Sequence, residues 1–154
     1  YKVNAIDPTD VEMLNEYYFE TMHHEFAHIL HQKKNYPTEY NQISAADYSS
    51  TGWQNRTEQQ AWKLGFVTPY AGMEPQEDFV EVIANYLVKP DGFWENMLAN
   101  AGTEGATKIQ TKFDMVKEWL MTAWNIDIDE LRTIIIRRSG DIDSILNEKI
   151  AYNE

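Results

Sequence analysis

Residues 24–28 read His24-Glu25-Phe26-Ala27-His28, an H-E-x-x-H pentapeptide, and they lie inside a segment whose apolar residues recur at a helical period. On an α-helix, residues i and i+4 are separated by about 40° around the axis and by about 6 Å along it, so His24 and His28 can turn both imidazoles toward one cation. Glu25 lies beside the first of them. The pentapeptide therefore predicts a zinc site with a carboxylate that can take a proton from water.

The helix that carries this pentapeptide is expected to run from about residue 7 to about residue 34. Asp7-Pro8-Thr9-Asp10 is typical of a helix start, and Asn35-Tyr36-Pro37 is typical of a helix end. Tyr1 to Ile6 is expected to form a short strand before it, and the polar residues from 37 to 53 predict a long loop.

Further helices are expected downstream, at residues 56–64 with Gly65 as the C-cap, 75–88, 91–100, 104–125 and 127–138, the last ending at Ser139-Gly140. Together with the strand, they predict a single domain over residues 1–154, of α+β class but predominantly α-helical. The chain opens at Tyr1 without a methionine, and we expect it to be the C-terminal part of a longer precursor.

The composition excludes several classes of protein. The 154 residues include 13 basic and 25 acidic side chains, and the net charge of −12 would repel a nucleic acid backbone, so no nucleic acid partner is expected. The absence of cysteine excludes disulfides and any zinc site built from thiolates. No run approaches the roughly 18 apolar residues of a membrane span.

A catalytic zinc needs a third protein ligand and an open position for water. A metzincin would place glycine and histidine where this chain has His31 and Lys34, so that pattern is excluded. His31 lies on the same stripe as His24, but about 10.5 Å further along the axis, which favours a supporting or packing role over a ligand role. His23 points about 100° away from His24 and is not expected to bind the metal.

The cluster Glu77-Asp78-Phe79-Val80-Glu81 opens the second strong helix and is the expected source of the third ligand. Glu77 and Glu81 share a face, so Glu77 can bind the metal while Glu81 accepts the second N–H of a ligand histidine. Asp78 is rotated away and is the weaker candidate, although the spacing excludes neither Asp78 nor Glu81 as the ligand. Alternatively, these acids only stabilise the start of their helix through its dipole.

Tyr70 lies seven residues before Glu77, in the segment that leads into the ligand helix. A phenol there can donate a hydrogen bond to the oxyanion of a tetrahedral intermediate. The alternative is a core aromatic, one of nine tyrosines in the chain.

Three separated blocks agree in order with a known family, and this part of the chain resembles the zinc-binding metallopeptidases of the substrate-import-associated zinc metallohydrolase lipoprotein type. The blocks are Thr21 to Gln32, Gly65 to Ala71 and Glu77 to Glu81. The resemblance implies a gluzincin-type site in a zincin-like fold, with Zn²⁺ held by His24, His28 and Glu77 and a peptide or protein as substrate. It implies that Glu25 is the general base and that Tyr70 stabilises the oxyanion, as in the similar lethal-factor-type toxin metalloproteases.

The resemblance also implies a cellular location. Members of this family carry an export signal that ends in a lipidated cysteine, and they reside at a bacterial outer membrane beside TonB-dependent nutrient-import components. A location in the cell envelope is therefore expected, with the membrane reached only through a lipid anchor that is absent from this chain. Zincin folds place a twisted sheet before the active-site helix, so the short strand here predicts a reduced or truncated N-terminal sheet.

Two other functions compete with a peptidase. A non-catalytic, zinc-containing accessory protein of a nutrient-import system would keep the metal, although the complete Glu25 base argues against it. A di-iron carboxylate protein needs Glu-x-x-His motifs on two helices, whereas both such motifs here, Glu20 to His23 and Glu25 to His28, lie on one helix. Zinc-dependent peptide hydrolysis is therefore the favoured hypothesis.

Overall fold

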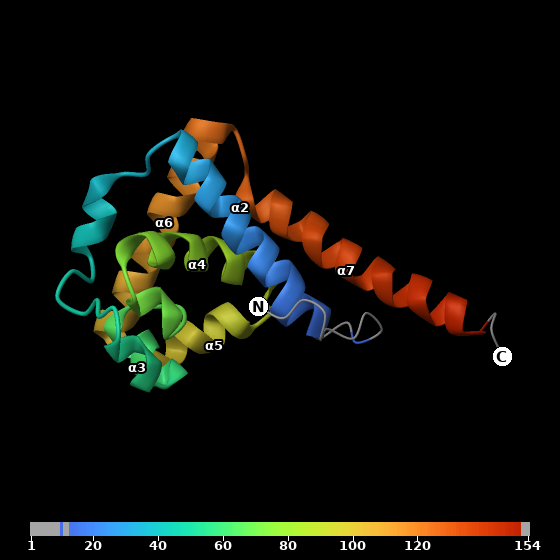
Figure 1. The fold of residues 1–154 in the computed structure, drawn as a ribbon, viewed down its shortest axis with the longest axis horizontal. Coiled ribbons are helices and arrows are strands. Elements are labelled where there is room, and N and C mark those ends of the chain that lie inside the picture. Colours follow the sequence, from blue (N-terminus) through green and yellow to red (C-terminus); the bar gives the residue numbers. More distant parts are fainter. Residues whose placement is uncertain (1–9, 11–12, 152–154) are drawn as a thin grey trace.

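The computed structural model describes residues 10 and 13–151, and every regular element within that part of the chain is a helix. Its α-helices are α2 (Glu20–Lys33), α3 (Glu58–Leu64), α4 (Pro75–Val88), α5 (Phe93–Asn100), α6 (Gly102–Trp124) and α7 (Ile128–Ala151). Helix α2 lies against α4, which also contacts α6 and α7, while α3 and α5 pack on α6 (Figure 1). The end of α7 extends away from the other helices (Figure 1).

Helix α4 forms the centre of the fold. Pro75 occupies its first turn, where the missing N–H costs nothing, and ten of its 14 residues are buried. A helix buried around most of its circumference must be covered by neighbours on several sides. Ala27 of α2 and Phe113 and Trp119 of α6 supply part of that cover. The histidine-bearing helix and the acidic helix are therefore held against each other by the core itself.

The predicted α+β class is wrong, because the described residues contain no strand and no sheet. Helix α4 is covered by α2, α6 and α7, so this core does not need a sheet to cover it. The strand expected over residues 1–6 lies outside the described residues, as does the expected helix start at residue 7. The predominantly helical part of the prediction agrees with the structure.

Several element boundaries also differ from prediction. A π-helical segment, η2 (Leu14–Phe19), precedes α2, and two short 3₁₀ turns, η3 (Thr38–Gln42) and η4 (Gly52–Asn55), interrupt the expected loop. Helix α7 continues through Gly140, although Ser139-Gly140 was expected to end it. One glycine inside a helix costs only about 1 kcal/mol relative to alanine, which a long helix tolerates.

Helix α3 follows its prediction closely. Thr57 caps it through a capping box with Gln60, and Gly65 ends it with a φ of 89°, a left-handed conformation that glycine adopts without strain. The chain then turns through residues 66–74 into α4. This turn includes η5 (Tyr70–Gly72), which brings Tyr70 back toward α2.

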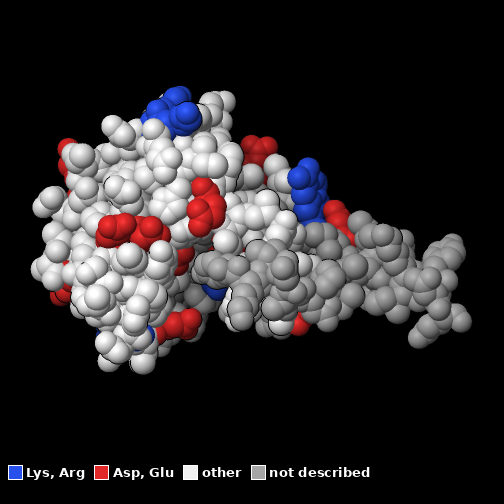
Figure 2. Space-filling model, viewed as in Figure 1, with Lys and Arg blue, Asp and Glu red and all other residues white. Residues whose placement is uncertain are grey.

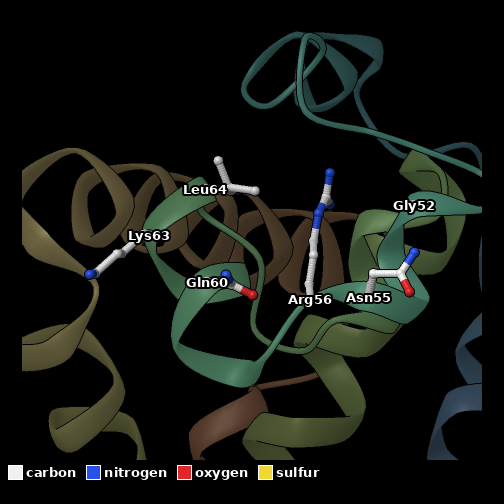
Figure 3. A pocket seen from close by; sticks show the side chains of 6 residues that line it. All are labelled: Gly52, Asn55, Arg56, Gln60, Lys63 and Leu64. Carbon is white, nitrogen blue, oxygen red and sulfur yellow. The ribbon is translucent and has the colours of Figure 1, made fainter.

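The described helices include no segment with the length and apolarity needed to cross a membrane. On the face drawn in Figure 2, the described residues carry scattered acidic side chains and only small basic groups. One surface pocket of about 410 Å³ lies between η4 and α3 and is lined by Gly52, Asn55, Arg56, Gln60, Lys63 and Leu64 (Figure 3). None of these six is an imidazole or a carboxylate, so this pocket offers zinc no side-chain ligand of its usual kinds.

Candidate metal centre

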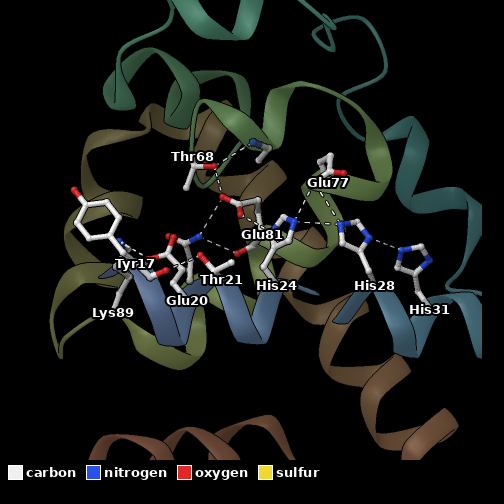
Figure 4. Close-up of polar contacts among 12 residues, drawn as sticks. Tyr17, Glu20, Thr21, His24, His28, His31, Thr68, Glu77, Glu81 and Lys89 are labelled. Carbon is white, nitrogen blue, oxygen red and sulfur yellow. Dashed lines mark hydrogen bonds and ion pairs between the residues drawn. The ribbon is translucent and has the colours of Figure 1, made fainter. Parts of the chain in front are cut away.

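Helix α2 presents its histidines to α4. Ala27, only 1% exposed, packs this side of α2 into the core, and His24 lies on the same side with 9% of its surface exposed. His28 follows one turn later, and the Nε2 atoms of His24 and His28 lie 3.1 Å apart. The helical spacing therefore does bring the two imidazoles to one point, as Figure 4 shows.

The first turn of α4 adds a carboxylate to this pair. Glu77 Oε2 lies 3.1 Å from Nε2 of His24 and 3.4 Å from Nε2 of His28. These three residues form the one group with metal-ligand character found among the described residues. Glu77 is thus the member of the acidic cluster that faces both histidines.

The three atoms fit a zinc ion in both chemistry and spacing. Imidazole nitrogen and carboxylate oxygen are zinc ligands, and ligands about 2.05 Å from a tetrahedral zinc are separated from one another by about 3.3 Å. Glu77 Oε2 is buried and has no hydrogen-bond partner, although a buried acceptor ordinarily has one. A buried carboxylate oxygen facing two imidazole nitrogens therefore has the ligand types and the charge that suit a cation.

Glu81 fixes the orientation of His24. Its Oε1 lies 2.8 Å from His24 Nδ1, and its Oε2 accepts a 2.6 Å hydrogen bond from the Thr68 hydroxyl. An N–H on Nδ1 leaves the lone pair of His24 on Nε2, facing Glu77. The contact expected between Glu81 and a ligand histidine is therefore present.

The pKa of His24 reflects this negative surrounding. Burial lowers the pKa, but the hydrogen bond to Glu81 and the charges of the neighbouring carboxylates outweigh burial, so the pKa lies above its ordinary value. The same electrostatic field that favours a proton on His24 favours a divalent cation in its place.

His31 contacts His28, the second histidine of this group. Its Nε2 lies 3.0 Å from His28 Nδ1, on the side of the His28 ring away from Glu77. Burial, followed by the nearby His28, lowers the pKa of His31, which favours a neutral ring that can accept a hydrogen bond. His31 is not part of the three-residue ligand group, in agreement with the supporting role favoured from its spacing.

Glu25 and Tyr70 share a cleft that opens beside His24. The cleft has a volume of about 410 Å³, and Tyr17, Trp53 and Thr68 also line it. Glu25 is exposed there, one residue beyond His24. The ring centroids of Tyr70 and His24 are 6.0 Å apart, and Trp53 packs edge-on against Tyr70 at 5.0 Å. A molecule in this cleft would contact Glu25 and Tyr70 together.

Comparison with known proteins identifies the family. A family model described as "putative zinc-binding metallo-peptidase" matches residues 1–129. The chain belongs to this family. The membership confirms the family predicted from the three sequence blocks, and it confirms zinc as the cofactor, for which the structure offers a site of two histidines and a glutamate.

A solved structure of a similar protein agrees with this membership of the zinc-binding metallopeptidase family. It is a "putative zinc-binding metallo-peptidase" from Bacteroides caccae ATCC 43185, with 52% sequence identity and a TM-score of 0.86. The similarity covers 92% of this chain and 54% of the other, so the chain spans about half the length of that protein. A search of curated proteins found no match.

Sequence reasoning missed Thr68, and it placed Trp53 among aromatics of the pocket or the core without identifying its contact with Tyr70. Thr68 holds Glu81, and Trp53 packs on Tyr70, yet neither residue type carries a metal-ligand signal. Their only sequence signal is position, Thr68 directly before Pro69-Tyr70 and Trp53 at the end of the predicted loop. The lipid anchor, the envelope location and the TonB-dependent partner implied by the resemblance stay predictions.

Proposed function

We propose that this chain hydrolyses peptide bonds as a zinc metallopeptidase, with His24, His28 and Glu77 as the metal ligands. The observation that carries the proposal is the triangle of three ligand atoms, 3.1, 3.1 and 3.4 Å apart, at the edge of a cleft that also contains Glu25. Family membership supports the same reaction class.

The reaction divides among the side chains of the cleft. When bound, zinc supplies a Lewis acid that polarises a carbonyl and lowers the pKa of water. The Glu25 carboxylate accepts the proton of the attacking water and returns it to the leaving amine. The Tyr70 hydroxyl donates a hydrogen bond to the oxygen that gains negative charge. Trp53 packs on the Tyr70 ring and holds it beside His24.

The test separates metal binding from catalysis. Purified wild type and Glu25→Gln are measured for zinc by plasma mass spectrometry and for cleavage of a mixed peptide library by mass spectrometry. We expect both to hold one zinc per chain, and we expect Glu25→Gln to cleave about 10²–10⁴-fold more slowly because it lacks the base. Glu130→Gln, an exposed glutamate on α7, is the matched control and should cleave like wild type.

Equal cleavage by Glu25→Gln would refute the assignment of the base. A wild type that holds zinc but cleaves no member of the library would refute the peptidase proposal and favour the accessory-protein alternative. A wild type without zinc, even after zinc is added back, would refute the ligand set.

A further inference from the structure

The two histidines of the metal centre are oriented by different partners. His24 Nδ1 lies 2.8 Å from a carboxylate oxygen of Glu81, whereas His28 Nδ1 lies 3.0 Å from Nε2 of another imidazole, that of His31 (Figure 4). No carboxylate contact to His28 Nδ1 is present among the described residues. His31 is thus the group in a position to fix the second ligand.

The proton positions in this chain of imidazoles follow from the ligand geometry. His28 Nε2 faces Glu77 and His24 Nε2, so a metal there requires its lone pair and leaves the proton of His28 on Nδ1. That N–H points at His31 Nε2, which must then be the acceptor, with the His31 proton on its own Nδ1. With both protons on Nδ1, His28 can bind the metal through Nε2 and donate its Nδ1–H to His31 at the same time.

The ring of His31 is held in position by burial and by aromatic contacts. His31 is 7% exposed, and its ring meets the edge of Tyr36 with centroids 5.7 Å apart. Tyr36 in turn stacks on Phe79 of α4, with ring centroids 4.2 Å apart. The ring of His31 is therefore fixed by the same core that fixes α4.

We propose that His31 is a positioning residue of the metal centre, which accepts the Nδ1–H of His28 and thereby holds the His28 Nε2 lone pair toward zinc. This inference rests on the proposed ligand set of His24, His28 and Glu77. A residue that only filled space would need no acceptor atom at this point, so the acceptor atom is what the test must remove and restore.

Zinc affinity measures this role without any peptidase assay. Competition with a chromogenic chelator gives the dissociation constant for wild type, His31→Phe and His31→Gln. We expect His31→Phe, which keeps a ring but has no acceptor, to weaken zinc binding by about 10–100-fold. His31→Gln should stay close to wild type, because its amide oxygen can reach the place of the imidazole Nε2. His23→Phe, on the same helix but outside the ligand group, is the matched control.

A second measurement needs no variant. Nitrogen-15 spectra of the histidine rings in the zinc-loaded wild type should show a protonated Nδ1 on His28 and an unprotonated Nε2 on His31 that is not bound to metal. Cadmium-113 in place of zinc should couple to nitrogens of His24 and His28 and not to His31.

Three results would overturn the inference while leaving the proposed function intact. They are wild-type zinc affinity in His31→Phe, equal losses in His31→Phe and His31→Gln, and cadmium coupling to His31. A wild type that binds no zinc would instead refute the ligand set on which the inference rests, so the two failures are distinguishable.

Discussion

Glu77 and Asp78 are neighbours in the first turn of α4, yet they meet opposite surroundings. Glu77 faces two imidazole nitrogens, at 3.1 and 3.4 Å. Asp78, rotated by about 100°, is completely buried and lies 2.5 Å from the ammonium of Lys112, while it accepts a 2.7 Å hydrogen bond from the Tyr48 hydroxyl. The Glu77 carboxylate faces two imidazoles, and the Asp78 carboxylate faces an ammonium and a hydroxyl.

The difference separates a carboxylate that faces imidazole nitrogens from a carboxylate whose Oδ2 is already paired with a buried cation. Burial raises the pKa of Asp78, and the contact with Lys112 opposes that rise. Lys112 also donates a 2.7 Å hydrogen bond to the carbonyl of Gly65, which ties α6 to the turn before α4. The pair of Asp78 and Lys112 therefore anchors α4, the helix on which Glu77 faces the histidines. Substitutions can test the buried pair and the metal centre separately.

The largest expected effect comes from breaking the buried pair of Asp78 and Lys112. Lys112→Met removes the cation and leaves Asp78 as an uncompensated buried charge, so we expect the free energy of unfolding to fall by about 3–5 kcal/mol. Urea unfolding of the metal-free protein, followed by circular dichroism, measures this loss. Lys33→Met, at an exposed position near the end of α2, is the control and should change stability by less than about 0.5 kcal/mol.

A double variant tests whether the pairing itself matters. If Asp78 is destabilising only when unpaired, Asp78→Leu combined with Lys112→Met should lose less stability than Lys112→Met alone. Additive losses would show that the two side chains contribute independently, and the description of Asp78 and Lys112 as a coupled pair would then be wrong.

The next largest effect is expected from adding zinc to the site formed by His24, His28 and Glu77. Zinc at 100 times its dissociation constant should raise the free energy of unfolding by about 2.7 kcal/mol, because it binds the folded state alone. Unfolding curves in zinc and in a chelator measure the difference. Glu77→Ala should lose most of this response, since it removes one of the three ligands, while its stability in the chelator should match or exceed that of wild type.

The zinc response also distinguishes among the three acidic candidates. If Glu77→Ala keeps the full stabilisation by zinc, the third ligand lies elsewhere in the acidic cluster. A loss of the response in Asp78→Asn with Glu77 intact would likewise reverse the roles assigned to these neighbours.

Whether a contact could be predicted from the sequence depends on how far apart its residues lie along the chain. The relation between His24 and His28 is local, because helix geometry alone fixes it, and the helix at residues 75–88 was predicted with its bounds from Pro75 and its apolar face. The shared face of Glu77 and Glu81 follows from the same local periodicity, and the structure turns that face toward the histidines.

Contacts between distant segments were not predictable in this way. Lysine is ordinarily exposed on a helix, and no residue near Lys112 in the sequence indicates that it is buried or that Asp78 is its partner. The contact of Trp53 with Tyr70 likewise depends on how two turns pack. The expected end of α7 at Gly140 was wrong because a single glycine inside a helix costs only about 1 kcal/mol and is a weak stop signal.

The smallest expected effect comes from a second, exposed lysine–carboxylate pair. Lys117 of α6 and Asp129 of α7 lie 2.6 Å apart, and the Tyr86 hydroxyl donates to the same carboxylate. Hydrogen bonds from Lys117 and Tyr86 hold the pKa of Asp129 below its ordinary value of 3.8. Because the folded-state pKa is the lower one, the resulting stability is present above pH 3.8 and is lost as the pH falls through the folded-state value.

Asp129→Asn isolates this contribution. About half of the side chain is exposed to solvent, which screens the charge, so wild type should exceed the variant by no more than about 1 kcal/mol at pH 7. The difference in urea midpoints should shrink toward zero as the pH is lowered below the folded-state pKa of Asp129, where both unfolded and folded carboxyls are protonated. A loss of stability as large as that of Lys112→Met would show that burial does not distinguish the two lysine–carboxylate pairs. The buried pair would then not be the stronger anchor that we infer for α4.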